Sequence, residues 1–175
     1  DVVADAGCDV FTVHARKAWL KGLSPKENRE IPPLDYDLVK ALKQARPDLK
    51  IILNGGITRL EDCAAHQVDF DGVMLGRAAY QSPALLGAVD ATLFDPNASI
   101  LSPVGAVTDY RPYIESQLAD GVRLSSMTRH MLGLFNGMPG ARLWRRVLSE
   151  HAPRQGASIA VLDEALDAVV SRLVA

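Results

Sequence analysis

Three short apolar runs in the first half of the chain have the pattern of β-strands. Each is too short to form a helix of its own, and none alternates apolar with polar positions. Such runs are typical of strands that are buried on both faces, as in parallel sheets. They cover residues 10–13, 50–53 and 71–75.

Helical patterns follow each of these runs. Asp35 can cap a helix with apolar residues at three- and four-residue spacing, which Pro47 ends. Thr58 and Glu61 have the spacing of a capping box that opens a second helix over 58–67. A short helix over 78–82 and a longer one over 83–94 follow the third run. This β-α-β-α-β-α order predicts an α/β fold with parallel strands, which we interpret as the C-terminal three βα units of a TIM (β/α)8 barrel, residues 1–94.

The second half of the chain has no strand pattern. Residues 95–107 contain Pro, Ser and Gly without a period and are interpreted as a linker. Residues 108–175 are expected to be all helical, since apolar residues recur there at helical spacing. The stripes are Leu124, Met127, Met131 and Leu134; Leu143, Trp144, Val147 and Leu148; and Ile159, Leu162, Leu166, Val169 and Leu173. The sequence therefore predicts a small helical bundle as a separate domain.

Charge is informative locally rather than overall. The 175 residues are 48% hydrophobic and 23% charged with a net charge of −2, which is ordinary globular composition. Basic residues gather in the loop over 16–29, and residues 121–149 contain five arginines and no acidic residue. Arg142, Arg145 and Arg146 fall on one helix face, opposite Leu143 and Val147, and such a face can neutralise phosphates. Solvated charged faces are the ordinary alternative for both basic regions.

Cysteine and histidine spacing indicates neither a disulfide framework nor a metal site. Cys8 and Cys63 are interpreted as small packing residues. The spacing of His66, His130 and His151 fits no metal site, so no metal is expected. Since the sequence has neither a signal peptide nor an apolar span of membrane length, we expect a soluble, cytoplasmic protein that binds no membrane.

The candidate chemistry lies where the predicted strands end. Asn54, Gly55 and Gly56 follow the second strand, Gly76 and Arg77 follow the third, and His14 ends the first. Glycine turns expose backbone N–H groups and arginine adds a fixed cation, so this edge could bind a phosphate. Each residue also has a structural alternative: a buried structural role for the histidine, an ordinary turn for Asn-Gly, and capping of carbonyl groups for the arginine.

Four segments resemble the tRNA-dihydrouridine synthases, most closely the A-type branch of the bacterial enzymes. They are residues 14–29 (HARKAWLKGLSPKENR), 53–57, 73–80 and 137–146. The resemblance implies an enzyme that uses FMN and NADPH to reduce specific uridines of the tRNA D-loop to 5,6-dihydrouridine. It also implies a barrel that binds FMN, a helical domain that binds tRNA, no DNA partner, and a monomer at full length.

The resemblance assigns roles to particular residues. The implied FMN contacts are His14, Asn54, Gly55, Gly56, Gly76 and Arg77; the implied tRNA contacts are Lys26, Arg29, Arg142 and Arg145. The general acid of the family is a cysteine in an Asn-Gly-Cys-Pro loop on the earlier half of the barrel. This chain has no such loop, so it offers no catalytic residue. We therefore expect a C-terminal part that lacks about five strands and is inactive on its own, with a poorly folded barrel half and a helical part, from Thr108 onward, that can persist as a small bundle.

Two other functions are compatible with the pattern. One is another FMN-dependent barrel oxidoreductase with a small substrate, which would leave the basic helical region unexplained. The other is an RNA-binding module without catalysis.

Overall fold

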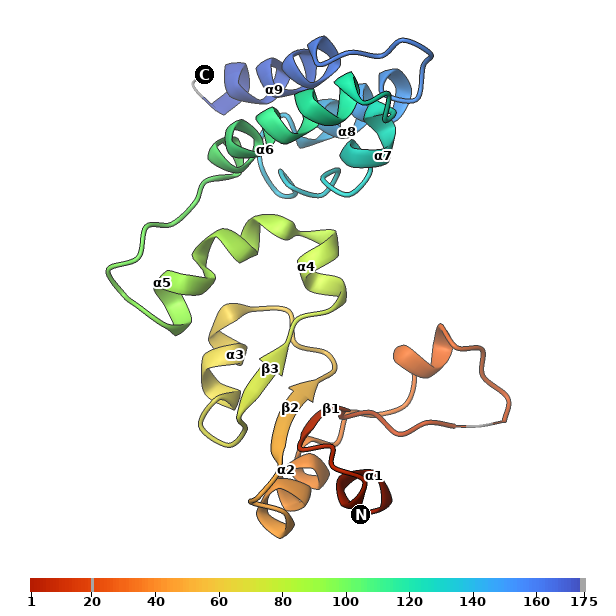
Figure 1. Ribbon diagram of the computed structural model, residues 1–175, viewed down its shortest axis with the longest axis vertical. Coiled ribbons are helices and arrows are strands. Elements are labelled where there is room, and N and C mark those ends of the chain that lie inside the picture. Colours follow the sequence, from red (N-terminus) through yellow and green to blue (C-terminus); the bar gives the residue numbers. More distant parts are fainter. Residues whose placement is uncertain (20, 174–175) are drawn as a thin grey trace. The chain divides into compact units, whose positions relative to one another are not determined.

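The computed structural model describes residues 1–19 and 21–173, so Leu20, within the motif over 14–29, lies outside the described residues. The chain divides into two compact units, Asp1–Ala78 and Ala79–Ala175. Figure 1 traces both along the sequence, and each is described here by itself.

A three-stranded parallel sheet forms the centre of the first unit (Figure 1). Its strands are β1 (Val10–His14), β2 (Lys50–Asn54) and β3 (Gly72–Met74), in the order β1-β2-β3. Their register places His14 beside Asn54 and Asn54 beside Met74. The three predicted strands and their parallel direction are confirmed.

Burial differs from strand to strand. In β2, Ile51 and Leu53 have no exposed surface, as expected for the central strand. In β1, every second side chain is exposed, Val10 by 48%. Strand β3, at the other edge, has no buried residue, and its Met74 is 44% exposed. The expectation that each strand is buried on both faces is therefore wrong for β1 and β3, because the described residues do not cover both faces of these edge strands.

The helices of the first unit show where capping was predicted well and where it was not. They are α1 (Val2–Asp5), α2 (Tyr36–Ala45), α3 (Leu60–His66) and the start of α4 (Arg77–Gln81). The Asp35 side chain caps α2 by accepting a 3.0 Å hydrogen bond from the Leu38 backbone N–H. The capping box at Thr58 and Glu61 is wrong: α3 begins at Leu60, its N-cap Arg59 makes no side-chain cap, and Glu61 is ion-paired with Arg59.

The long segment between β1 and α2 is a hydrogen-bonded loop. An isolated bridge between Arg16 and Leu34 closes its base, and the Asn28 side chain bonds both backbone groups of Trp19. Ser24 and Glu27 form a reciprocal capping box at the 3-10 turn η1 (Glu27–Arg29). The loop therefore has defined internal structure, although its sequence has no helical or strand period.

The second unit is helical in the described residues. After α4 it contains η2 (Pro83–Ala88), α5 (Val89–Leu93), α6 (Pro103–Ala119), α7 (Leu124–Thr128), α8 (Ala141–His151) and α9 (Ala160–Leu173). Ser102 caps α6 by accepting from the Gly105 N–H, so this helix begins within the segment that we interpreted as a linker.

One core holds α6 to α9 together. Trp144 is fully buried at its centre, packs edge to face on Phe135 with ring centres 4.7 Å apart, and donates to the Met131 carbonyl over 3.0 Å. The predicted helical stripe from Leu124 to Leu134 is buried, but its helix is not continuous. Helix α7 ends at Thr128, and turns with glycines and a proline lead to α8.

No helix in residues 1–19 and 21–173 combines the length and the apolar character needed to cross a membrane.

Candidate functional site

The carboxyl ends of the three strands bring together the residues predicted from the glycine turns. Because the strands are parallel, the register places His14 and Asn54 at one level, and Gly55 follows directly. Gly76 and Arg77 follow β3 after one intervening residue. The predicted site residues thus share one edge of the sheet, which is the edge where α/β proteins place ligands.

Gly55 and Gly56 have backbone conformations that favour glycine, with φ angles of +119° and +73°. A Cβ atom on Gly55 would lie 2.5 Å from His14 Nδ1, so the absent side chain leaves room for the imidazole ring. His14 Nδ1 also lies 3.4 Å from the Asn54 carbonyl oxygen, and Tyr36 donates to the Gly55 carbonyl over 2.7 Å. The glycine turn and the exposed His14 ring therefore form one small arrangement.

Arg77 already has a partner that the sequence did not suggest. Its Nη1 lies 2.9 Å from Glu30 Oε1, and its Nη2 donates to the Arg29 carbonyl over 3.2 Å. Both side chains are about half exposed, and the remaining N–H groups of the guanidinium have no hydrogen bond within the described chain. A Cβ on the neighbouring Gly76 would meet nothing within 4 Å, so there is open space beside this cation.

The residues at this edge fit a phosphate group. A permanently charged fork with free donors lies next to a glycine whose backbone is uncovered, and no bulky side chain fills the space. The Glu30 carboxylate opposes an incoming anion, so the anion would share Arg77 with it. The neighbouring helices α3 and α4 are only one or two turns long, so their N-terminal ends add little positive charge. Arg77 therefore supplies the positive charge of this site.

Arg77 connects the candidate site to the basic loop. Lys26 and Arg29 have exposed side chains on or next to η1, and Arg77 holds this turn through Glu30 and the Arg29 carbonyl. Arg16 holds the same loop from its base by donating to the carbonyls of Glu30 and Pro32. Two arginines thus fix the loop that carries the basic side chains.

The basic face on α8 has the predicted geometry. Arg142, Arg145 and Arg146 are exposed, whereas on the opposite face Val147 is buried in the core of the second unit and Leu143 is partly buried. Arg145 donates to the side-chain oxygen of Asn136, which fixes its position. The other two arginines form no salt bridge within the described chain.

The two cysteines lie in different environments. Cys63 is fully buried in α3, and burial raises the pKa of its thiol, so it is a packing residue as predicted. Cys8 is exposed, which contradicts the interpretation of it as a packing residue, because β1 begins only at Val10 and Cys8 lies in the connection before it. Across residues 1–19 and 21–173, no cluster of three or more His, Cys, Asp or Glu side chains could hold a metal ion.

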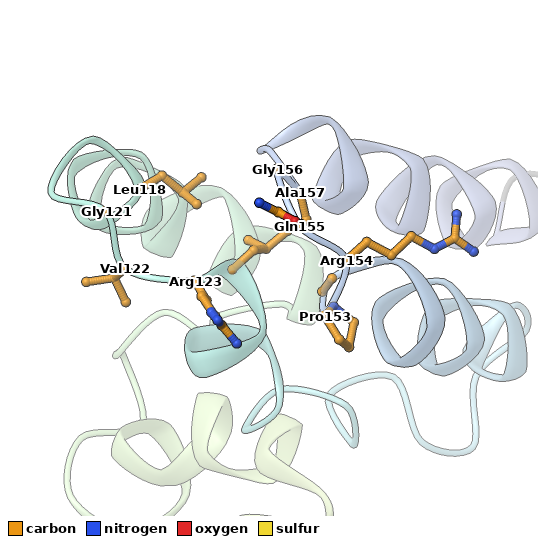
Figure 2. Close-up of a pocket in the computed structure, with 11 residues that line it drawn as sticks. Leu118, Gly121, Val122, Arg123, Pro153, Arg154, Gln155, Gly156 and Ala157 are labelled. Carbon is orange, nitrogen blue, oxygen red and sulfur yellow. The ribbon is translucent and has the colours of Figure 1, made fainter.

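A hollow of about 500 Å³ in the second unit offers no comparable chemistry. Leu118, Val122 and Pro153 line it together with Arg123 and Arg154. Figure 2 shows the Arg154 side chain extending away from Arg123, so their charges do not converge on a common point.

Fold and site together define an α/β protein with a phosphate-compatible strand edge and a helical unit that carries a basic face. Comparison with known proteins shows to which family this α/β protein belongs. A family model described as "Dihydrouridine synthase (Dus)" matches residues 1–170. The chain belongs to the dihydrouridine synthase family.

Curated relatives agree with this assignment. The chain is 54% identical over 165 residues to a tRNA-dihydrouridine(20/20a) synthase of Yersinia pestis, covering 94% of this chain and 48% of the relative. Proteins of the same name from Pasteurella multocida and Shewanella oneidensis are 54% and 53% identical, covering 97% and 100% of this chain and 52% of each relative. The chain thus spans about half the length of the curated relatives it matches.

Proposed function

We propose that this chain is part of a tRNA-dihydrouridine synthase that uses FMN and NADPH to reduce specific uridines of the tRNA D-loop to 5,6-dihydrouridine. The observation that carries this proposal is the juxtaposition of His14, the Gly55-Gly56 turn and Gly76-Arg77 at the carboxyl edge of a parallel sheet. The relatives are named for this modification of tRNA.

The proposed architecture places the sheet at the end of a (β/α)8 barrel. Residues 1–94 would supply the C-terminal three βα units, 95–107 a connection and 108–175 the helical tRNA-binding domain. The first unit supports this reading, because its three strands are parallel and consecutive. The two compact units divide earlier, after Ala78, because the helices that follow β3 pack with the helical part.

Each residue at the strand edge has a role toward FMN. Arg77 would bind the phosphate with the donors that Glu30 and Arg29 leave free, next to the uncovered backbone of Gly76. Gly55 and Gly56 would allow the ligand to approach the backbone close to Asn54, and the His14 ring nitrogens could bond a phosphate or a ring edge. Bound FMN would supply the hydride for reduction of the pyrimidine ring.

The residues proposed to contact tRNA lie on both units. They are Lys26 and Arg29 on the basic loop and Arg142 and Arg145 on α8; each has an exposed, positively charged side chain that can neutralise an RNA phosphate. An oxidoreductase with a small substrate would have no use for the face on α8. We further propose that the protein acts in the cytoplasm as a monomer.

Removal of the Arg77 side chain tests the FMN site. In the full-length protein, Arg77→Ala should weaken FMN binding roughly 10- to 100-fold, since a charge-assisted contact to the phosphate is lost. Titration of apo-protein with FMN, followed by flavin fluorescence, measures the dissociation constant. Arg46→Ala is a matched control, because Arg46 pairs with Asp48 before the amino end of β2. Equal dissociation constants for Arg77→Ala and the unmodified protein would contradict the assignment.

A further inference from the structure

A second pocket in the helical unit combines two arginines with an aromatic side chain. It measures about 580 Å³, within the range of roughly 300–1,000 Å³ that is usual for small-ligand sites. The residues that give it its character are Tyr80, Arg129, His130, Asn136 and Arg145. All of these residues belong to the unit Ala79–Ala175, and none of the described residues that line the pocket is acidic.

A chain of hydrogen bonds fixes which groups in this pocket are free to donate. Arg129 Nε lies 3.0 Å from His130 Nε2, and His130 Nδ1 lies 3.2 Å from the Tyr80 hydroxyl. An arginine nitrogen can only donate, so His130 Nε2 is the acceptor and the ring proton is on Nδ1. His130 then donates to the Tyr80 oxygen. The hydroxyl hydrogen of Tyr80 is therefore left to bond a ligand.

The second arginine, Arg145, is held by a separate set of hydrogen bonds. The Asn136 side chain accepts a hydrogen bond from Arg145 and donates one to the Gln81 carbonyl over 2.6 Å. This single amide therefore links the Arg145 guanidinium to the backbone of Gln81. Gly133 allows this arrangement, because a Cβ there would lie 2.1 Å from the same Gln81 carbonyl oxygen. Neither Arg129 nor Arg145 forms a salt bridge with the described residues. Two uncompensated cations thus border one pocket.

We infer that this pocket is a subsite for one nucleotide of single-stranded RNA. Arg129 and Arg145 bind its phosphodiester, and the Tyr80 hydroxyl donates to a phosphate or base oxygen. Tyr80 is 59% exposed and its ring meets His130 edge to face, so the open surface of the ring can stack on the base. The inference rests on the proposed function for its occupant, tRNA. It adds Tyr80, Arg129 and His130 to the residues that recognise the substrate.

Variants of the full-length protein test the subsite by tRNA binding at several salt concentrations. Arg129→Gln should weaken binding about tenfold. It should also reduce the salt slope, which is the steepness with which log affinity falls with log salt concentration, by about one. Tyr80→Phe should weaken binding about threefold without a change in slope, because a neutral donor is lost. Arg172→Gln on α9 is the control, since this exposed arginine donates only to its own helix among the described residues. It should change neither quantity.

The outcomes separate this inference from the proposed function. If Arg142→Ala weakens tRNA binding while Arg129→Gln and Tyr80→Phe do not, the subsite is wrong and the proposed function stands. If the unmodified protein does not bind tRNA, both are wrong. Phosphate ethylation of the tRNA gives an independent readout: one ethylated phosphate should impair binding of the unmodified protein more than binding of Arg129→Gln, which has already lost one of the two arginine contacts to that phosphate. If every phosphate matters equally to both proteins, the subsite is refuted.

Discussion

Gly137 and Gly140 lie in the turn before α8 with nearly the same left-handed backbone, at φ angles of +82° and +84°. They differ in their surroundings. A Cβ on Gly137 would meet nothing within 4 Å, whereas one on Gly140 would lie 2.8 Å from Val169 Cα and 2.9 Å from the Ala168 carbonyl oxygen. Gly140 therefore allows the start of α8 to approach the backbone of α9.

Alanine substitutions at Gly137 and Gly140 distinguish the cost of backbone strain from the cost of steric overlap. Gly137→Ala should lower the free energy of unfolding by about 1 kcal/mol, the usual cost of a left-handed alanine. Gly140→Ala carries the same cost plus overlap with a helix backbone, so its loss should exceed that of Gly137→Ala by about 1–3 kcal/mol. Urea unfolding followed by fluorescence of the buried Trp144 measures both. Equal losses would mean that α8 and α9 do not meet at Gly140.

Residue type and position in the sequence predicted part of the candidate site. His14, Gly55 and Arg77 were identifiable because each follows a short apolar run, and parallel strands align their ends. Glu30 was not, because 47 residues separate it from Arg77 and only the folded loop brings the two together. The exposure of Cys8 was also missed, since the strand was expected to start at Cys8 and starts at Val10.

At the scale of the element, helix starts depend on local hydrogen bonds that the sequence suggests only in part. Asp35 caps α2 as predicted, but the Ser24 and Glu27 box was overlooked and the one at Thr58 and Glu61 does not form. The start of α6 at Ser102 and Pro103 carried a usable signal, an N-cap serine before a proline. The linker interpretation missed it because residues 95–107 contain Pro, Ser and Gly without a period.

Helices α6 and α9 are joined by an ion pair that makes stability depend on pH. Both carboxylate oxygens of Asp163 accept from Arg111, and this contact lowers the pKa of Asp163. A lowered pKa in the folded state stabilises the fold above the unfolded value of about 3.9. The contribution is lost as the pH falls through the lower, folded value.

Asp163→Asn should therefore destabilise the protein at pH 7 but not in strong acid. The loss at pH 7 should be less than about 1 kcal/mol, because the pair is partly exposed to solvent. Below pH 4 the difference should shrink as Asp163 in the unmodified protein takes up its proton. Urea unfolding at pH 7 and pH 3 measures this, with Asp167→Asn on the same helix as control. A difference as large at pH 3 as at pH 7 would contradict the electrostatic explanation.

For the whole molecule, the sequence predicted two unlike halves, and the structure has a sheet unit and a helical unit. Periodicity was sufficient for that, because strands and amphipathic helices differ in period. It was insufficient for residues 129–140, where buried apolar residues continue the stripe of α7 while glycines and a proline prevent a helix. That irregular segment carries Arg129, His130 and Asn136, so the pocket could not be predicted from helical spacing.

Each unit carries a basic surface, formed by Lys26 and Arg29 on the first and by Arg142 and Arg145 on the second. If a single tRNA contacts both, replacing Lys26 and Arg29 with alanine should weaken its binding, and so should replacing Arg142 and Arg145. Each lost phosphate contact should reduce the salt slope by roughly 0.7–0.9. The salt slope should therefore fall by up to about two in each double variant, and by about the sum of the two reductions in the fourfold variant. Because separate contacts add, the losses in log affinity should also add.

Binding of the full-length protein to tRNA at several salt concentrations measures this. The flavin absorbance spectrum serves as the control: it should not change in the Arg142 and Arg145 variant, because these residues lie outside the strand-edge site. The spectrum of the Lys26 and Arg29 variant should not change either, because Arg77 contacts the Glu30 side chain and the backbone carbonyl of residue 29, which these substitutions leave in place. If the fourfold variant binds no more weakly than one double variant, only one of the two surfaces contacts tRNA.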